Sequence, residues 1–239
     1  MEFIQTNAIV LNKIQIKDFQ YLLKLYTEQK GFITAAVEIN HFIQPAHLQV
    51  PNIIDVQIVQ KRSQRYQIKD IKPSYVYQTL YIDFKKNAIA QFLVEVLIKT
   101  LKEEEEVIDE KIFSLLNSTF IQLDKSNTES LLLFHLLFLR EFVILSGHTP
   151  LENFDSLNAY FHLQEGKFIS HPNEQTLDKN DSQLLYQFFF DNKQLNGKDF
   201  SVFRLTHILL DYMRHHLLLQ QVQSLSFLKD ALMEFELKY

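Results

Sequence analysis

The sequence contains no cysteine and no tryptophan, and it has only four glycines among its 239 residues. Without cysteine there is no disulfide, no thiolate nucleophile and no zinc site built on thiolates. The glycines lie at least 19 positions apart. Dinucleotide- and phosphate-binding loops need glycines two to five residues apart, because the backbone N–H groups must approach the phosphate closely. These nucleotide-binding motifs are therefore excluded, as is the Gly-x-Ser-x-Gly motif of hydrolases.

Long hydrophobic runs are also missing. The longest, from Leu131 to Leu139, already contains His135 and is followed by Arg140. A bilayer span needs about 20 apolar residues. The first four residues include an acid, Glu2, where a signal peptide has lysine or arginine. We therefore expect a cytoplasmic protein with no membrane segment.

Charge is distributed unevenly along the chain. Residues 1–80 hold nine Lys and Arg against six Asp and Glu, a net charge of +3, whereas residues 81–239 hold fifteen against twenty-three, a net charge of −8, which together give the overall −5. The hydrophobic pattern changes at the same position, from alternation to spacings of three and four. We therefore expect two domains, residues 1–80 and residues 81–239.

The first half predicts five short strands, and the second half predicts helices, so the expected fold class is α+β. The expected strands are Ala8–Ile16, Tyr21–Thr27, Phe32–Ile39, Ile53–Gln60 and Tyr66–Ile71. Five short strands within about 70 residues are typical of a small barrel, with an OB-fold as the leading interpretation and an SH3-like barrel as the alternative.

Apolar stripes in the second half predict six helices and one short hairpin. Asp83 is a candidate N-cap for the first helix, and Glu165-Gly166 is the expected turn of the hairpin. The expected helices span residues 84–102, a segment marked by Ile112, Leu116, Phe120 and Leu123, and residues 128–145, 181–195, 199–219 and 224–237; the hairpin pairs Tyr160–Leu163 with Lys167–Ile169.

The search for catalytic residues yields one histidine-rich candidate. His207, Asp211 and His215 follow each other at intervals of four on an expected helix. The two histidines are then about 12 Å apart along the helix axis, which is too far for one metal ion to bind both. Pairing of these side chains at the surface is the simpler interpretation, and a metal-dependent nuclease is the alternative. We predict that the protein is not an enzyme and uses no metal or cofactor.

A cluster of cations suggests a nucleic-acid-binding surface. Five Lys and Arg side chains fall within residues 61–72, together with Tyr66. In an OB-fold this segment is the loop between strands four and five, which closes over oligonucleotides. Cations neutralise phosphates, and aromatic rings stack on bases. The candidate DNA-binding residues are Lys13, Lys17, Lys24, Lys61, Arg62, Arg65, Tyr66 and Lys69, with Phe19 and Tyr21 beside the first three. The alternative is an ordinary charged hairpin tip.

Several short segments, taken in order, are similar to a known family. They are Ala8–Leu11, Leu25–Glu28 before Gly31, Pro73–Tyr77 leading into Ile82–Ala90 and Phe92–Leu97, Phe134–Leu139 before Gly147 and Pro150, Tyr160–Leu163, Tyr212–Leu217, and Ser224-Leu225 with Leu228-Lys229. The chain resembles the RecO family of bacterial recombination mediators over nearly its whole length, most closely the versions without a zinc module.

The resemblance implies an N-terminal OB-fold domain joined to an α-helical domain, and no covalent chemistry. It implies binding of single- and double-stranded DNA, annealing of complementary strands, and work with RecR and the single-strand-binding protein SSB to load RecA. It also implies association with the nucleoid during repair. The chain departs from the family in two ways: it lacks the four zinc-binding cysteines, and it has no Lys or Arg between Lys30 and Lys61.

A protein-binding adaptor with little affinity for DNA is the competing interpretation. The net charge of −5 and the missing basic run favour it. In that case Arg140, Arg204 and Arg214 are the candidates for binding the acidic tail of a partner, because guanidinium groups form charge-assisted hydrogen bonds with carboxylates.

Overall fold

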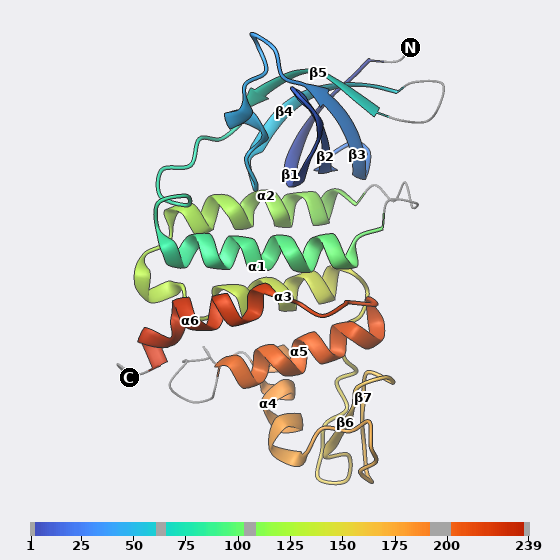
Figure 1. Ribbon diagram of the computed structural model, residues 1–239. Helices are drawn as coiled ribbons and strands as arrows, with labels where there is room; N and C mark the ends of the chain where they lie inside the picture. Colours follow the sequence, from blue (N-terminus) through green and yellow to red (C-terminus); the bar gives the residue numbers. More distant parts are fainter. Residues whose placement is uncertain (1–2, 61–65, 103–108, 192–201, 237–239) are drawn as a thin grey trace. The chain divides into compact units, whose positions relative to one another are not determined.

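The computed structural model describes residues 3–60, 66–102, 109–191 and 202–236 (Figure 1). The chain divides into two compact units, residues 1–125 and residues 126–239, which we describe separately. The change from strands to helices expected near residue 80 therefore lies inside the first unit. As a boundary between functional domains, residue 80 stays a prediction.

A closed five-stranded barrel forms the N-terminal part of the first unit. Its strands are β1 (Phe3–Lys17), β2 (Gln20–Thr27), β3 (Gly31–Glu38), β4 (Ile53–Gln60) and β5 (Tyr66–Pro73), in the order β1-β2-β3-β5-β4. β3 and β5 are parallel, and the other neighbours are antiparallel. This is the OB-fold topology, so the leading fold prediction is confirmed. β1 begins earlier than expected because Phe3–Ile9 pair with β4.

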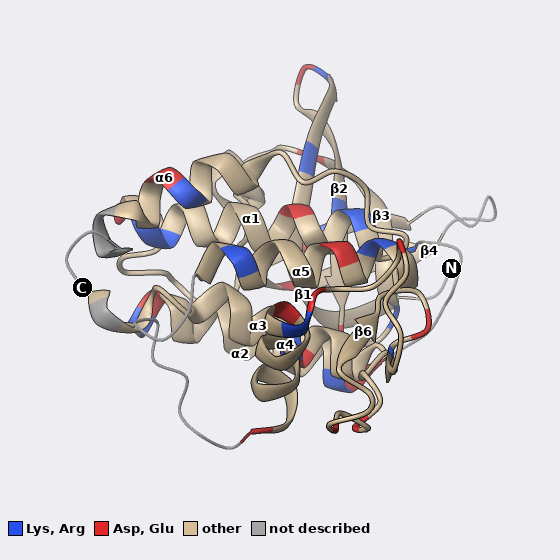
Figure 2. Ribbon diagram, turned by 90° about the horizontal axis from the view of Figure 1, so that it is seen from below, with Lys and Arg blue, Asp and Glu red and all other residues tan. Residues whose placement is uncertain are grey.

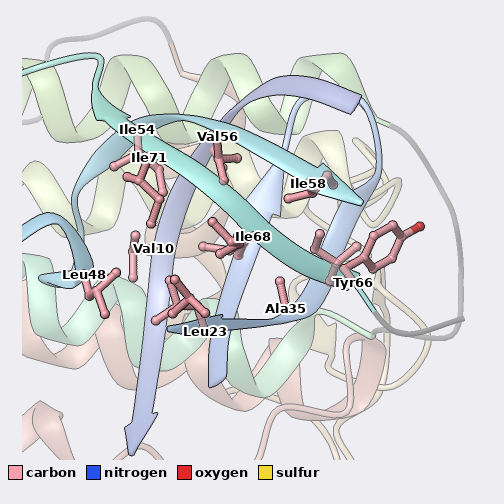
Figure 3. Packing of buried hydrophobic residues seen from close by; sticks show 14 of the residues in the cluster. Val10, Leu23, Ala35, Leu48, Ile54, Val56, Ile58, Tyr66, Ile68 and Ile71 are labelled. Carbon is pink, nitrogen blue, oxygen red and sulfur yellow. The ribbon is translucent and has the colours of Figure 1, made fainter. Parts of the chain in front are cut away.

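Alternation along each strand fills the barrel with branched side chains. Ile4, Ala8 and Val10 of β1 belong to the core, and so do Leu23 and Leu25 of β2. Burying a side chain such as leucine or isoleucine stabilises the fold by about 1.5–3 kcal/mol. In Figure 3, Leu48, from the short 3-10 helix η1 (Pro45–Leu48), lies at one end of the core and Tyr66 lies at the other.

The first unit also contains helices α1 (Phe84–Thr100) and α2 (Glu110–Lys125). Asp83 caps α1 as predicted, because its side chain accepts hydrogen bonds from the backbone N–H groups of Lys85 and Lys86. α1 packs against β1. Tyr26, on the outer face of β2, is only 3% exposed, and its pKa is raised by burial and by the charge of Asp109. Part of the outer face of the barrel is therefore covered.

Asp124, near the end of α2, holds the segment between β5 and α1. Its carboxylate accepts hydrogen bonds from the N–H groups of Gln78, Thr79 and Leu80 at distances of 2.7–3.1 Å, and from the Tyr75 hydroxyl at 3.0 Å. Burial alone raises the pKa of this carboxyl, but the hydrogen bonds outweigh burial and lower the pKa to about 2. The linker is thereby attached to the end of α2.

The second unit is helical, with one small hairpin. It contains α3 (Phe134–Leu145), β6 (Tyr160–His162), β7 (Lys167–Ile169), α4 (Lys179–Phe190), α5 (Val202–His216) and α6 (Ser224–Glu236). α5 packs against both α3 and α4. The predicted β6–β7 hairpin is confirmed, and its turn includes Gly166 at a φ of 65°.

Some predicted helix ends were wrong. The helix expected from Thr128 begins only at Phe134, because residues 128–130 form a separate 3-10 turn (η2) capped by the Asn127 side chain. α5 ends at His216 rather than at Leu219, and Leu218 beyond it has a φ of 53°, which is not helical. α4 ends at Phe190 rather than at residue 195, because Asp191 after it already has an extended backbone. The expected ends at residues 199 and 237 lie outside the described residues. Among the helices that the structure describes, none combines the length and apolar character needed to cross a membrane.

Candidate nucleic-acid interface

The β1–β2 hairpin extends beyond the closed part of the barrel. Pairing of β1 with β4 ends at Ile9, whereas pairing with β2 continues from Asn12 to Lys17. A register shift between Val10 and Asn12 separates the two parts of β1. Figure 2 shows the hairpin extending outward from the barrel, with the blue segments of its lysines along it. Every side chain from Lys13 to Gln20 is exposed.

The lysines predicted to line this hairpin lie on different faces. Lys13 is directly opposite the core residue Leu23, so the two side chains share a face. Its Nζ lies 6.0 Å from the centre of the Tyr21 ring. Lys24 is opposite Asn12 on the other face, with its Nζ 5.6 Å from the centre of the Phe32 ring. The structure therefore does not bring Lys13 and Lys24 into one groove.

Two tyrosine rings pack on the same part of the barrel core. Tyr66, which is 9% exposed, is paired with Ala35 of β3, and Tyr21 is opposite Val37, two residues further along that strand. Figure 3 shows the Tyr66 hydroxyl directed away from the core side chains. Among the sequence-predicted residues, Lys13 thus lies beside Tyr21, and Tyr21 packs on the same part of the core as Tyr66.

The other candidate cations of the barrel are distributed differently. Lys17 is exposed near the tip of the hairpin. Lys69 lies in β5 where its pairing with β4 shifts, and its Nζ donates a hydrogen bond to the Gln67 side chain at 3.1 Å. Lys61, Arg62 and Arg65 lie outside the described residues, so their place in the interface stays a prediction.

No salt bridge joins Lys13, Lys17 or Lys69 to a carboxylate within the described part of the chain. Lys72 differs, because its Nζ lies 3.6 Å from the Asp70 carboxylate. A lysine without an internal carboxylate partner can bind a phosphate without first breaking an ion pair. Beside an aromatic ring, it offers the two contacts that single-stranded DNA uses, charge neutralisation and stacking.

The tip of the hairpin carries an exposed aromatic ring in an unusual conformation. Phe19 has a φ of 64° and is 65% exposed. This left-handed conformation raises the conformational energy of a residue that has a Cβ atom by about 1 kcal/mol or more, and glycine would avoid the increase. Strain of this kind is concentrated at functional positions, so it favours a binding role for the tip.

The three predicted partner-binding arginines all contact groups within their own unit. Arg204 forms a bidentate ion pair with Asp181, whose side chain is largely buried, and this pairing raises the pKa of Arg204. Arg214 forms an exposed ion pair with Asp211. Arg140 donates a hydrogen bond to the Phe189 carbonyl at 2.8 Å. Their role in binding an acidic tail stays a prediction.

The histidine-rich candidate forms no metal-binding cluster. Asp211 is paired with Arg214, and His207 and His215 are exposed on α5. Across the described ranges, no group of three or more His, Asp or Glu side chains is placed to hold a metal ion. The geometry therefore favours surface pairing for these residues.

Sequence reasoning missed two structural features of the first unit. One is Asp124, for which the sequence did contain a signal. A carboxylate in the last turn of a helix is unfavourable because that end of the helix carries partial negative charge. Such a carboxylate therefore needs hydrogen-bond donors from another part of the chain. The other is the unpaired outer edge of β1 beyond the barrel, which depends on where β4 begins to pair. Alternation within one strand carries no such information.

Comparison with known proteins gives consistent matches over most of the chain. The chain is 29% identical over 226 residues to the DNA repair protein RecO of Flavobacterium johnsoniae, covering 90% of this chain and 92% of that protein. It is 30% identical over 169 residues to the protein of the same name from Phocaeicola vulgatus, covering 66% and 69%. For Flavobacterium psychrophilum the identity is 26% over 224 residues, covering 90% and 92%. No family model matches the chain.

Proposed function

This chain belongs to the RecO family of DNA repair proteins, and we propose that it binds single-stranded DNA through the β1–β2 hairpin end of its barrel. The observation that carries this proposal is the exposed hairpin, whose Lys13 and Lys17 form no salt bridge within the described residues, with Tyr21 beside Lys13. The predicted cations Lys61, Arg62 and Arg65 lie within the five residues before Tyr66 in the sequence and would extend the same surface.

Phosphate contacts supply most of the affinity in this mechanism, so little sequence preference is expected. Lys13, Lys17, Lys61, Arg62 and Arg65 would each neutralise one phosphate. Five such contacts predict a slope of about −3.5 for the logarithm of the binding constant against the logarithm of salt concentration. Raising the salt from about 50 to 200 mM would then weaken binding roughly a hundredfold.

Annealing follows from the same proposal, and the partner functions are suggested by the family. Two strands whose phosphates are neutralised repel each other less, so complementary strands can approach and pair. The family resemblance further suggests binding of double-stranded DNA and cooperation with RecR and SSB in loading RecA. The binding itself requires no covalent step, so none is proposed.

Fluorescence anisotropy with a labelled single strand tests the DNA-binding proposal. The variant Lys61→Ala/Arg62→Ala/Arg65→Ala is expected to bind at least tenfold more weakly at low salt, with a slope smaller in magnitude by about 2. A matched control, Lys111→Ala/Lys179→Ala/Lys229→Ala, removes three exposed lysines from helices and should bind nearly as wild type. A wild-type slope near zero, or equal losses in both variants, would overturn the proposal.

A protein-binding adaptor is the second candidate function. It is favoured by the absence of Lys and Arg between Lys30 and Lys61 and by the covered outer face around Tyr26. Retention of RecR and SSB in a pull-down, combined with no detectable anisotropy change on a single strand, would select this function over DNA binding.

A further inference from the structure

The outer part of β1 has an unpaired edge. From Asn12 to Lys17 this strand is hydrogen-bonded to β2 on one side, and no described strand lies on its other side, since pairing with β4 ends at Ile9. The Lys13 N–H is satisfied locally, because it donates to the Asn12 side chain at 2.7 Å. An exposed edge of this kind is a template for adding another strand.

The side chains of this edge are apolar on one face and carry Lys13 on the other, up to a second register shift between Gln15 and Lys17. Ile14 and Ile16 are 48% and 52% exposed. Ile14 is opposite the half-buried Leu22, whereas Lys13 is opposite Leu23 on the face of the barrel core. An added strand alternates in the same way, so it would meet isoleucine on one face and lysine on the other.

The charges of the edge decide which strand fits. Pairing with a second copy of the same edge would bring the lysines of one copy near those of the other, and like charges on adjacent strands are destabilising. An acidic strand would instead place a carboxylate beside Lys13, and Lys17, which pairs with Gln20 beyond the second register shift, would add positive charge nearby. Among the hairpin residues 12–24 the only acid is Asp18, against three lysines. DNA phosphates can accept hydrogen bonds from single backbone N–H groups, but DNA cannot form the continuous ladder of hydrogen bonds that an added strand forms.

We propose that the edge of β1 from Asn12 to Lys17 binds an extended segment of a partner protein that alternates acidic and apolar side chains. The partner segment adds a strand to the barrel, with its acidic side chains toward Lys13 and its apolar side chains toward Ile14 and Ile16. This site does not depend on the DNA-binding proposal, because it uses a ladder of main-chain hydrogen bonds that only another strand can form.

Binding of a defined peptide tests the proposal. The probe is the labelled peptide acetyl-Glu-Val-Glu-Val-Glu-Val-Glu-Val-amide, titrated with the full chain and followed by anisotropy. Lys13→Glu/Lys17→Glu is expected to weaken its binding about tenfold, because the favourable cross-strand pair at Lys13 and the attraction of the nearby Lys17 both become repulsive. The control Lys72→Glu/Lys111→Glu makes the same charge change at exposed positions away from this edge and should leave binding unchanged.

Two further measurements separate strand addition from attraction by charge alone. The same peptide with alternate backbone nitrogens methylated keeps its charges but loses its donors along one edge, and it should bind at least tenfold more weakly. Bound peptide should also slow hydrogen exchange of the amides in residues 12–17. Equal binding of the methylated peptide, protection of these amides by single-stranded DNA but not by peptide, or self-association of the chain through this edge would overturn the proposal.

Discussion

The charged side chains of the β1–β2 hairpin and those of the helices differ in whether they have partners within the chain. On the hairpin, Lys13 and Lys17 are exposed and form no salt bridge within the described residues. In the helices, the Asp124 carboxylate accepts hydrogen bonds from three backbone N–H groups and from side-chain hydroxyls, and Asp181 is held by Arg204. Burial explains the difference, because a buried carboxylate must be satisfied by its own chain, whereas an exposed lysine is solvated until a ligand arrives.

This contrast separates residues that maintain the fold from residues that are available for ligands. Substitution of a buried acid should lower stability, and substitution of a hairpin lysine should lower binding at constant stability. The following predictions test that division, beginning with the largest expected effect.

Asp124→Ala should have the largest effect on stability. The substitution removes the acceptor for the N–H groups of Gln78, Thr79 and Leu80, which lie at the junction of β5, α1 and α2. Leaving one buried and several partly buried donors unsatisfied should lower the free energy of unfolding by about 3 kcal/mol. Urea unfolding measures the change. Asp70→Ala, at a partly exposed position, is the control and should change the value by less than about 0.5 kcal/mol.

Lowering the pH should remove the contribution of the Asp124 carboxylate to the stability of the wild type. Because the folded-state pKa of Asp124 is lowered from 3.8 to about 2, its contribution is present above pH 3.8 and is lost as the pH falls toward 2. The stability advantage of the wild type over Asp124→Asn should shrink by about 2 kcal/mol between pH 5 and pH 2. Urea unfolding at several pH values gives this difference, and a constant advantage would contradict the assignment.

Arg204→Ala and Arg214→Ala should differ although both remove an arginine from α5. Loss of Arg204 leaves the largely buried Asp181 without its bidentate partner and should cost about 1–2 kcal/mol. Loss of Arg214 breaks an exposed pair with Asp211 and should cost less than about 0.5 kcal/mol. Thermal unfolding at neutral pH compares them. Equal losses would show that burial of the acid does not decide the outcome.

Lys13→Ala/Lys17→Ala should leave stability within about 0.5 kcal/mol of wild type, because both side chains are exposed and form no salt bridge within the described residues. If both lysines contact phosphate, the salt slope for single-stranded DNA should become less steep by about 1.4. Anisotropy over a salt series measures it. An unchanged slope would show that the hairpin lysines do not contact the DNA phosphates.

The sequence was sufficient for the barrel and for most helices because each depends on a local pattern. Alternation in Ile53–Gln60 and the Asp83 cap both predicted the observed elements. The start of α3 was wrong because a local turn capped by Asn127 replaced the first part of the apolar stripe. Local competition of this kind is decided by side-chain hydrogen bonds that hydrophobic spacing does not report.

The candidate site was harder to predict because it depends on register. The types of residue were visible, but the shift between Val10 and Asn12 determines that Lys13 shares a face with Leu23 while Lys24 lies on the opposite face. The partners of Arg204 and Arg214 likewise depend on which helices pack together and on side-chain rotamers. Neither kind of information is carried by the spacing of charges along the chain.

The register shift between Val10 and Asn12 also divides β1 into parts with different evolutionary freedom. Before it, Phe3–Ile9 pair with β4, and Ala8–Val10 pair with β2. Beyond it, matched insertion or deletion of paired residues in β1 and β2 would lengthen or shorten the hairpin without moving Ile4, Ala8 or Val10 from the core. Relatives can therefore acquire new specificity by remodelling this appendage while inheriting the barrel unchanged.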